Sequence, residues 1–219
     1  MTDLPRITTF AWVPPFARGF VRDLRARWAF EEVGQAYAVD LIDAPYAKSP
    51  AHRRFQPFGQ VPTYSDADVE IFESGAIALH ICATGGALIP ADPAAKIRAV
   101  QWLIAALNSV EPFVMSLAVN DLFEADRAWS AMRRPKVIED LDARLHDLAA
   151  ALGDRTWLDG EDFTVGDLMM VSVLGGLRGT GVLDSWPTLT AYVARGEARP
   201  AHRKAMADHL AVYTDQAAA

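Results

Sequence analysis

The chain has 219 residues, of which 51% are hydrophobic and 22% charged, with a formal net charge of −7 and a sequence pI near 5.2. This length and composition predict a globular protein of one large or two small domains, and the acidic balance argues against nucleic-acid partners and against anionic membranes. The single cysteine, Cys82, excludes an intramolecular disulfide. Residues 1–9 hold no apolar signal core, and no stretch is expected to span a bilayer, so the expected location is the cytoplasm.

The first forty residues follow a strand–helix–strand pattern. Residues 7–13 are rich in Thr and aromatic side chains, which is typical of a strand, and two prolines end the run. From Gly19 the apolar residues are spaced by four, which predicts a helix that stops at Gly34. Residues 36–42 predict a second strand. This order favours parallel pairing of the two strands.

A strand–strand–helix pattern follows a polar, proline-containing link. Residues 61–65 and 69–72 flank an acidic turn, which predicts an antiparallel hairpin. Residues 74–84 predict a helix that closes at two glycines. The two patterns together predict a thioredoxin-like α/β domain over residues 1–86.

The rest of the chain, residues 92–219, predicts an all-α helical domain. From residue 94 the apolar residues step by threes and fours along a long helix, in which we expect a kink at Pro112. Thr164 and Asp167 form a capping-box pattern ahead of a helix that is apolar nearly all round. The segment rich in Gly, Pro and Asp at residues 85–93 is the predicted domain boundary.

The most specific functional pattern lies between Gln60 and residue 78. The Val61-Pro62 bond could be held cis, which would leave the backbone N–H and C=O of Val61 for an extended ligand. Glu73 and Ser74 open the next helix, where Ser74 can cap the helix and the unpaired N–H groups favour an anion. A short extended peptide with a free carboxylate fits both features.

At these residues the chain resembles the soluble glutathione S-transferases, whose first domain carries a cis Val-Pro bond and a Glu-Ser pair at the start of the next helix. The resemblance implies a cytoplasmic, homodimeric detoxification enzyme with glutathione as cosubstrate. It implies that Val61, before Pro62, pairs with the cysteinyl backbone of glutathione, and that Gln60 lies near the glycyl end. Glu73 and Ser74 would hold the γ-glutamyl end. The alternative is an ordinary strand start and an ordinary helix cap.

Residues 12–20 depart from the family pattern. The family usually places a Tyr, Ser or Cys between the first strand and the first helix to hold the thiol as a thiolate, and this connection contains no Tyr, Ser, Thr or Cys. The groups that remain nearby are the Trp12 indole N–H, the guanidinium groups of Arg18 and Arg22, and the first N–H groups of the helix. These three side chains are the candidate catalytic groups.

Three further side chains, those of Arg25, Arg27 and Cys82, have a structural interpretation. A solvated helix face is the expected place of Arg25 and Arg27, with Arg27 paired to Glu31. Cys82 lies in an apolar helical segment and is predicted to be a small buried hydrophobe. The histidines and acids show no metal-ligand spacing, so no metal is expected.

The second substrate is expected between the two domains, against the long helix. Asn108, Pro112 and Met115 share a stretch of that helix and, with Phe16, are the candidate pocket residues. An apolar pocket beside a thiolate implies a small hydrophobic electrophile, which the thiolate would attack. Two alternatives remain open: a non-catalytic glutathione-binding or interaction module, which the missing hydroxyl favours, and a glutathione-dependent disulfide or peroxide reductase.

Overall fold

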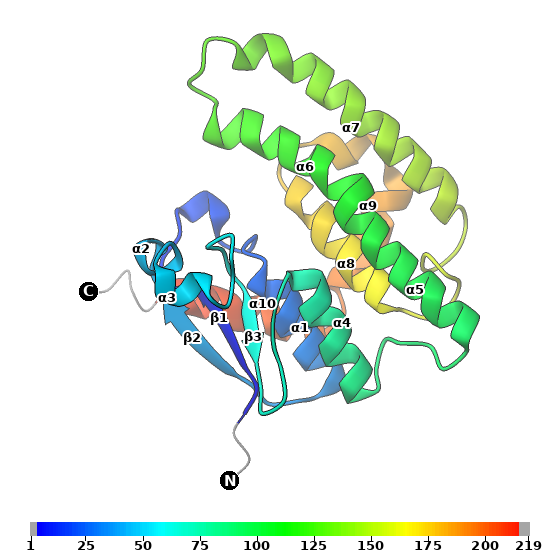
Figure 1. Ribbon diagram of the computed structural model, residues 1–219. Coiled ribbons are helices and arrows are strands. Elements are labelled where there is room, and N and C mark those ends of the chain that lie inside the picture. The colour runs from blue at the N-terminus through cyan, green and yellow to red at the C-terminus, as the bar shows by residue number, and fades with distance from the viewer. Residues whose placement is uncertain (1–3, 215–219) are drawn as a thin grey trace. The chain divides into compact units, whose positions relative to one another are not determined.

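The computed structural model describes residues 4–214, which form two compact units (Figure 1). Residues 4–89 and 199–214 make up the first unit, and residues 90–198 make up the second. The last helix of the chain therefore packs with the first unit. The predicted division into domains over residues 1–86 and 92–219 stays a prediction.

The first unit contains a four-stranded sheet in the order β2-β1-β3-β4 (Figure 1). β1 pairs with β2 in parallel, with Ile7 opposite Val39, whereas β3 pairs antiparallel with β1 and with β4. The parallel pair and the hairpin agree with the sequence patterns, and the thioredoxin-like class is confirmed. The strands are β1 (Arg6–Phe10), β2 (Ala38–Ile42), β3 (Thr63–Ser65) and β4 (Glu70–Phe72).

The turn of the β3–β4 hairpin is closed by the carboxylate of Asp66. Its Oδ1 accepts hydrogen bonds from the backbone N–H groups of Asp68 and Val69, both at 2.8 Å, and its Oδ2 accepts one from the Tyr64 hydroxyl at 2.6 Å. The hydrogen bond from Tyr64, together with those from the turn, lowers the pKa of Asp66 to about 2. The hairpin is thus held by a carboxylate that is ionised at neutral pH.

Three long helices of the first unit pack together, with α1 against both α4 and α10. α1 approaches α4 closely, because a Cβ added at Gly85 would lie 2.6 Å from Cβ of Val33. Two single-turn helices, α2 and α3, lie in the link and were not predicted; each has a proline in its first two positions and is capped by Asp43 or Ser49. The helices are α1 (Asp23–Val33), α2 (Ala44–Ala47), α3 (Pro50–Arg53), α4 (Ser74–Gly85) and α10 (Pro200–Thr214), preceded by the turn η1 (Pro15–Ala17).

The expectation of a solvated arginine face on α1 is wrong. Arg25 and Arg27 are buried, with 6% and 3% of their surface exposed. Arg27 pairs with Asp23 at 2.7 Å, one turn earlier, rather than with Glu31. The reason is tertiary: helices cover α1 on two sides, so a charged residue on either side must find its partner inside the unit.

Polar contacts join α1 to α10 and to Arg199, the residue just before α10. Arg199 donates through Nε and Nη2 to the two carboxylate oxygens of Glu32, both at 2.6 Å, and the Trp28 indole N–H donates to Glu32 at 2.9 Å. Lys204 contacts Glu31 at 3.1 Å. Paired Arg–carboxylate bonds of this kind fix geometry as well as adding energy, so they set the position of α10 along α1.

The second unit is helical (Figure 1). Its most buried element is α8. α8 packs against α5 and α9, and it approaches α5 so closely that a Cβ at Gly166 would lie 2.6 Å from Cβ of Trp102. The predicted nearly all-round apolar character of this helix fits its burial. The elements are α5 (Pro93–Ala105), η2 (Ala106–Val110), α6 (Glu111–Ala118), η3 (Val119–Phe123), α7 (Ser130–Leu152), α8 (Val165–Leu174), η4 (Gly175–Leu177), η5 (Val182–Ser185) and α9 (Pro187–Glu197).

The long helix runs without a break from Pro93 to Phe123, over 31 residues. The π-helical segment η2 comes just before Pro112, which occupies the first turn of α6, where a missing N–H is tolerated. By length and composition this helix could cross a membrane, which corrects the expectation that no stretch qualifies. The helix nevertheless packs against α8 and α7 in the second unit, and core helices of soluble proteins meet the same criteria.

The predicted capping box at the start of α8 is present. The Asp167 carboxylate accepts hydrogen bonds from the Thr164 N–H at 2.9 Å and from the Thr164 hydroxyl at 3.0 Å. Its other oxygen accepts from the Leu158 N–H and the Tyr192 hydroxyl, both at 2.9 Å. Asp167 therefore caps α8 and also ties it to α9 and to the loop before it.

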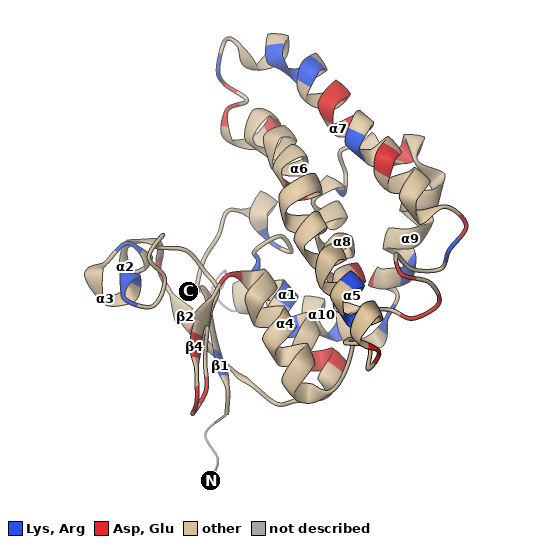
Figure 2. Cartoon of the chain, turned by 45° about the vertical axis from the view of Figure 1, so that its right-hand side comes forward, with Lys and Arg blue, Asp and Glu red and all other residues tan. Residues whose placement is uncertain are grey.

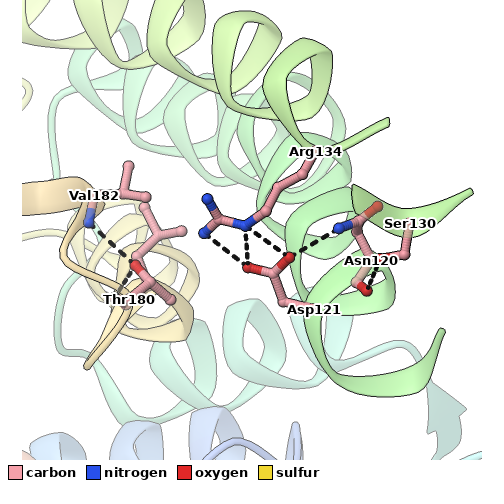
Figure 3. A network of polar contacts seen from close by, with 7 residues as sticks. Asn120, Asp121, Ser130, Arg134, Thr180 and Val182 are labelled. Atoms are coloured by element: carbon pink, nitrogen blue, oxygen red, sulfur yellow. Dashed lines mark hydrogen bonds and ion pairs between the residues drawn. The ribbon is translucent and has the colours of Figure 1, made fainter. Parts of the chain in front are cut away.

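A polar network joins η3 to the start of α7 (Figure 3). The Ser130 hydroxyl donates to the Asn120 carbonyl at 3.0 Å, and the Asn120 amide donates to Asp121 at 2.8 Å. Arg134 donates to both oxygens of Asp121 at 3.0 Å. Burial alone would raise the pKa of Asp121, but the hydrogen bonds from Arg134 and Asn120 hold it below its usual value.

Positive and negative residues follow one another along α7, whereas α6 is nearly uncharged (Figure 2).

Candidate functional site

The start of α4 holds the predicted carboxylate site. Ser74 is the first residue of α4 and is buried, and its hydroxyl oxygen accepts a hydrogen bond from Nη1 of Arg25 at 3.0 Å. The N-cap position belongs to Glu73, whose side chain makes no capping hydrogen bond, so the expectation that Ser74 caps the helix is wrong. Ser74 instead faces α1, and Arg25 is the partner that sequence analysis missed.

Glu73 has an unusual backbone conformation. Its φ is +71° and its ψ 116°, and its side chain is exposed. Few residues other than glycine adopt positive φ, and residues held in such conformations cluster at functional sites. The strained residue therefore lies immediately before the first N–H groups of α4, at the end of the helix that favours anions.

The segment before β3 carries the other half of the predicted binding corner. The Val61-Pro62 peptide bond is cis, and Pro62 is buried while Val61 is half-buried. β3 begins directly afterwards, where the Thr63 N–H donates to the Thr8 hydroxyl of β1 at 2.8 Å. Val61 therefore lies two residues before a strand that is anchored to β1.

The link helices support the backbone at Gln60. Nε2 of the buried His52 lies 2.8 Å from the Gln60 carbonyl oxygen, and Nζ of Lys48 donates to the Gly59 carbonyl at 2.7 Å. The Gln60 side chain itself is exposed. His52 and Lys48 carry no pattern in the sequence that marks them, because they come from the link whose short helices were not predicted.

The loop of residues 12–20 contains the predicted catalytic groups. Trp12 is 62% exposed and Phe16 is also exposed. The guanidinium carbon of Arg18 lies 5.9 Å from the ring centre of Tyr213 in α10, and its Nε is buried without a hydrogen-bond partner among the described residues. Arg22 occupies the N-cap position of α1. The loop therefore places Arg18 beside α10 rather than on an open surface.

A buried charged cluster lies behind this loop. The Gly19 N–H donates to Nε2 of His209 at 3.2 Å, and Nδ1 of His209 lies 3.2 Å from Oδ2 of Asp23. Burial alone would raise the pKa of Asp23, but hydrogen bonds from His209 and Arg27 hold it below its usual value. Burial raises the pKa of the neighbouring Tyr213 to about 12, and the charge of Asp23 acts in the same direction. Sequence analysis did not find this cluster, because it joins residues 186 positions apart.

The predicted pocket residues of the second unit lie on the long helix. Asn108 is in η2, and Pro112 and Met115 are in α6; Asn108 and Pro112 are exposed and Met115 is half-buried.

Cys82 lies fully buried in α4 of the first unit, and burial raises the pKa of its thiol to about 12, so it is no thiolate nucleophile at neutral pH. Among residues 4–214, no group of three or more His, Cys, Asp or Glu side chains could hold a metal ion.

Comparison with known proteins agrees with this fold. Residues 16–83 match the family described as the N-terminal domain of glutathione S-transferases. A glutathione S-transferase of Hyoscyamus muticus is 31% identical over 163 residues, which cover 68% of this chain and 75% of that protein. One of Arabidopsis thaliana is 31% identical over 71% of this chain and 76% of its own length.

Solved structures share the fold at low identity. A glutathione transferase family member from Pseudomonas fluorescens, solved with two glutathione molecules bound, matches with a TM-score of 0.81 at 19% identity, covering 93% of this chain and 92% of that one. The chain has the two-part fold of a glutathione transferase, a thioredoxin-like sheet with helices and a helical remainder. It belongs to the glutathione S-transferase family, which confirms the resemblance and the predicted enzyme class. The roles of the individual site residues stay predictions.

Proposed function

We propose that the chain binds glutathione at the corner formed by residues 60–62 and 73–74 and conjugates its thiolate to a small hydrophobic electrophile. The observation that carries this proposal is the Arg25–Ser74 contact at the N-terminus of α4. Because Arg25 donates to the Ser74 oxygen, the Ser74 hydroxyl hydrogen is left to donate to a ligand. A carboxylate there would meet a hydroxyl donor, the unpaired N–H groups of α4 and a buried cation.

The rest of the tripeptide would extend along the strand end. Val61 would pair through its N–H and C=O with the cysteinyl residue, as one more strand does, beside Pro62. Gln60 would lie near the glycyl end, on backbone that His52 supports. Glu73 would contribute its carboxylate near the γ-glutamyl amino group. Family relatives solved with glutathione bound support this choice of ligand.

Activation of the thiol is assigned to the loop of residues 12–20. Lowering the thiol pKa by about two units stabilises the thiolate by roughly 2.7 kcal/mol, which one good cationic or N–H donor near a helix N-terminus can supply. Arg18 is the first candidate, with the Trp12 indole N–H and Arg22 as the others. Phe16 is proposed to contact the hydrophobic electrophile, and Asn108, Pro112 and Met115 stay candidate pocket residues of the second unit, as the sequence predicts. We also propose a homodimer located in the cytoplasm, as the family resemblance implies.

The missing hydroxyl favours one alternative, a glutathione-binding module that has lost catalysis. Calorimetric titration with glutathione tests the binding corner, and we expect binding at millimolar or lower concentration. The ultraviolet absorbance of bound thiolate as a function of pH then separates the two functions. A bound thiol pKa below that of free glutathione supports the transferase, and an unchanged one supports the module. Absence of binding would remove both.

A further inference from the structure

The backbone of the loop of residues 12–20 lies directly against the last helix of the first unit. Gly19 has a φ of +83°, a backbone conformation that residues other than glycine rarely adopt. A Cβ added there would lie 3.5 Å from Sδ of Met206 and 4.0 Å from a methyl carbon of Leu210, both in α10. The loop is therefore shaped to bring its backbone N–H to α10, where Nε2 of His209 accepts it.

The partners of His209 define its protonation. Nε2 can accept from the Gly19 N–H only through a bare lone pair, so the ring proton lies on Nδ1 and is donated to Oδ2 of Asp23. The same oxygen accepts from Nε of Arg27 at 2.7 Å. The carboxylate and the guanidinium neutralise each other, so a neutral imidazole leaves this fully buried cluster without net charge.

Arg18 is the residue next to the anchored amide. Its guanidinium lies over the ring of Tyr213, and that ring contacts the His209 ring edge-on, with centres 5.3 Å apart. The peptide between Arg18 and Gly19 is thus held on both sides by α10, through the amide and through the side chain. A shift of His209 would move the backbone from which Arg18 projects.

We propose that His209 is a positioning residue for the thiol site: through the Gly19 amide it fixes the loop that carries Arg18, and Asp23 fixes the ring in the required tautomer. This inference rests on the proposed function, in which that loop activates the glutathione thiol. His209 itself touches no substrate. Its loss should therefore affect thiol activation and turnover more than glutathione affinity, since the binding corner lies just before β3 and at the start of α4.

The first experiment uses the unmodified protein. Nitrogen-15 NMR of the imidazole rings distinguishes a protonated from a bare ring nitrogen, and we expect His209 to have a bare Nε2, with slow hydrogen exchange at the Gly19 amide. A proton on Nε2 of His209 would overturn the proposal. Neither reading depends on turnover, so both remain valid even if the protein conjugates nothing and the proposed function fails.

The second experiment separates the two contacts of His209 with a matched pair of variants. In H209Q the amide oxygen can replace Nε2 as acceptor for Gly19, whereas in H209N the amide can replace Nδ1 as donor to Asp23 but leaves Gly19 without an acceptor. For H209N we expect roughly tenfold faster exchange at the Gly19 amide and a fall of roughly tenfold in kcat, the size of one lost hydrogen bond, with the KM for glutathione within about twofold. H209Q should stay within about threefold of the parent protein in both the Gly19 exchange rate and kcat.

The control for general damage to α10 is H202N, because His202 is also buried in that helix but packs against Trp28. It should lower the melting temperature without accelerating exchange at the Gly19 amide. Equal losses in H209N, H209Q and H202N would show a purely structural helix contact and overturn the proposal. Should neither His209 variant fold, the tautomer and the Gly19 exchange of the parent protein decide.

Discussion

Ser74 and Arg25 form the residue pair on which the binding proposal depends. The hydroxyl lies buried at the first turn of α4, and the guanidinium reaches it from α1. An arginine in this place both orients the hydroxyl and adds positive charge next to the helix N-terminus. A neutral ligand would gain little from this combination, whereas a carboxylate gains from every part of it.

Replacing Ser74 by alanine should weaken glutathione binding. A hydrogen bond to a carboxylate contributes about 1.5–3 kcal/mol, which corresponds to a dissociation constant raised roughly ten- to a hundredfold. Calorimetric titration measures the change, with Ser65→Ala, in β3, as the control. An unchanged affinity in Ser74→Ala would end the assignment of the carboxylate to this residue.

Arg18→Ala tests the activating group. Loss of a nearby cation should raise the pKa of the bound thiol by about one unit or more, because an opposite charge within a few ångströms stabilises the thiolate by that amount or more. The thiolate absorbance measured against pH reports the value. Arg53→Ala, an exposed arginine in α3, is the control and should leave it unaltered. If the Arg18 variant behaves like the control, Trp12 or Arg22 takes its place as candidate.

At the scale of the element, helix α4 has two roles. Its first turn presents the proposed anion site, and its body is core, with Ile77, Ile81 and Cys82 buried. The helix carries no Lys, Arg, Asp or Glu after Glu73, so its N-terminal field is not offset within the helix. Its position is fixed by the close contact of Gly85 with Val33 of α1.

The thiol of Cys82 should be inert in the folded protein. Burial in α4 raises its pKa to about 12, so almost no thiolate exists at neutral pH and a reagent cannot reach it. Titration with a chromogenic disulfide should show no reaction in the native state and one equivalent in denaturant. Fast reaction in the native state would mean that α4 opens locally.

The capping box makes a second prediction for an element. Thr164→Ala removes a hydroxyl that bonds to Asp167 at the start of α8, and it should lower the free energy of unfolding by about 0.5–2 kcal/mol. Urea unfolding measures this loss. Thr84→Ala, at the exposed end of α4, serves for comparison and should stay within about 0.5 kcal/mol. A loss no greater than that of the comparison variant would remove the cap from the list of stabilising contacts.

For the whole molecule, ionised carboxylates within the fold determine the response to acid. Asp66 has a pKa of about 2 in the folded state, below its unfolded value near 3.9, and the pKa of Asp23 is lowered as well. Groups of this kind contribute stability that is complete above the unfolded pKa and is lost as pH falls through the folded one. The fold is therefore expected to weaken between about pH 4 and pH 2.

Unfolding in urea at a series of pH values checks this expectation. The urea midpoint should fall steadily below about pH 4, and Asp66→Asn should reduce the slope, because it removes one of the titrating groups. The variant will also be less stable at neutral pH, since its side chain cannot accept the turn hydrogen bonds equally well. A slope identical to that of the parent would show that Asp66 does not contribute.

Much of the candidate site could be predicted from local patterns. Val61-Pro62 and Glu73-Ser74 lie within fourteen residues of one another, so their order and spacing are visible in the chain itself. The capping box at Thr164 and Asp167 is equally local, and it is present as predicted. By contrast, Arg25 was expected in solvent, and nothing in the pattern of α1 indicates that α4 and α10 would cover it.

The sequence alone determined the family, the order of the four strands and two long helices in the first ninety residues, and the absence of a hydroxyl or thiol from residues 12–20, because each depends on neighbours along the chain. Only the tertiary structure decided which polar groups meet. The Arg25–Ser74 contact, the His209–Asp23–Gly19 chain and the place of α10 in the first unit all join residues far apart in sequence. Such pairings follow from how helices pack, and helical periodicity specifies only that a face is buried, not which side chain it will face.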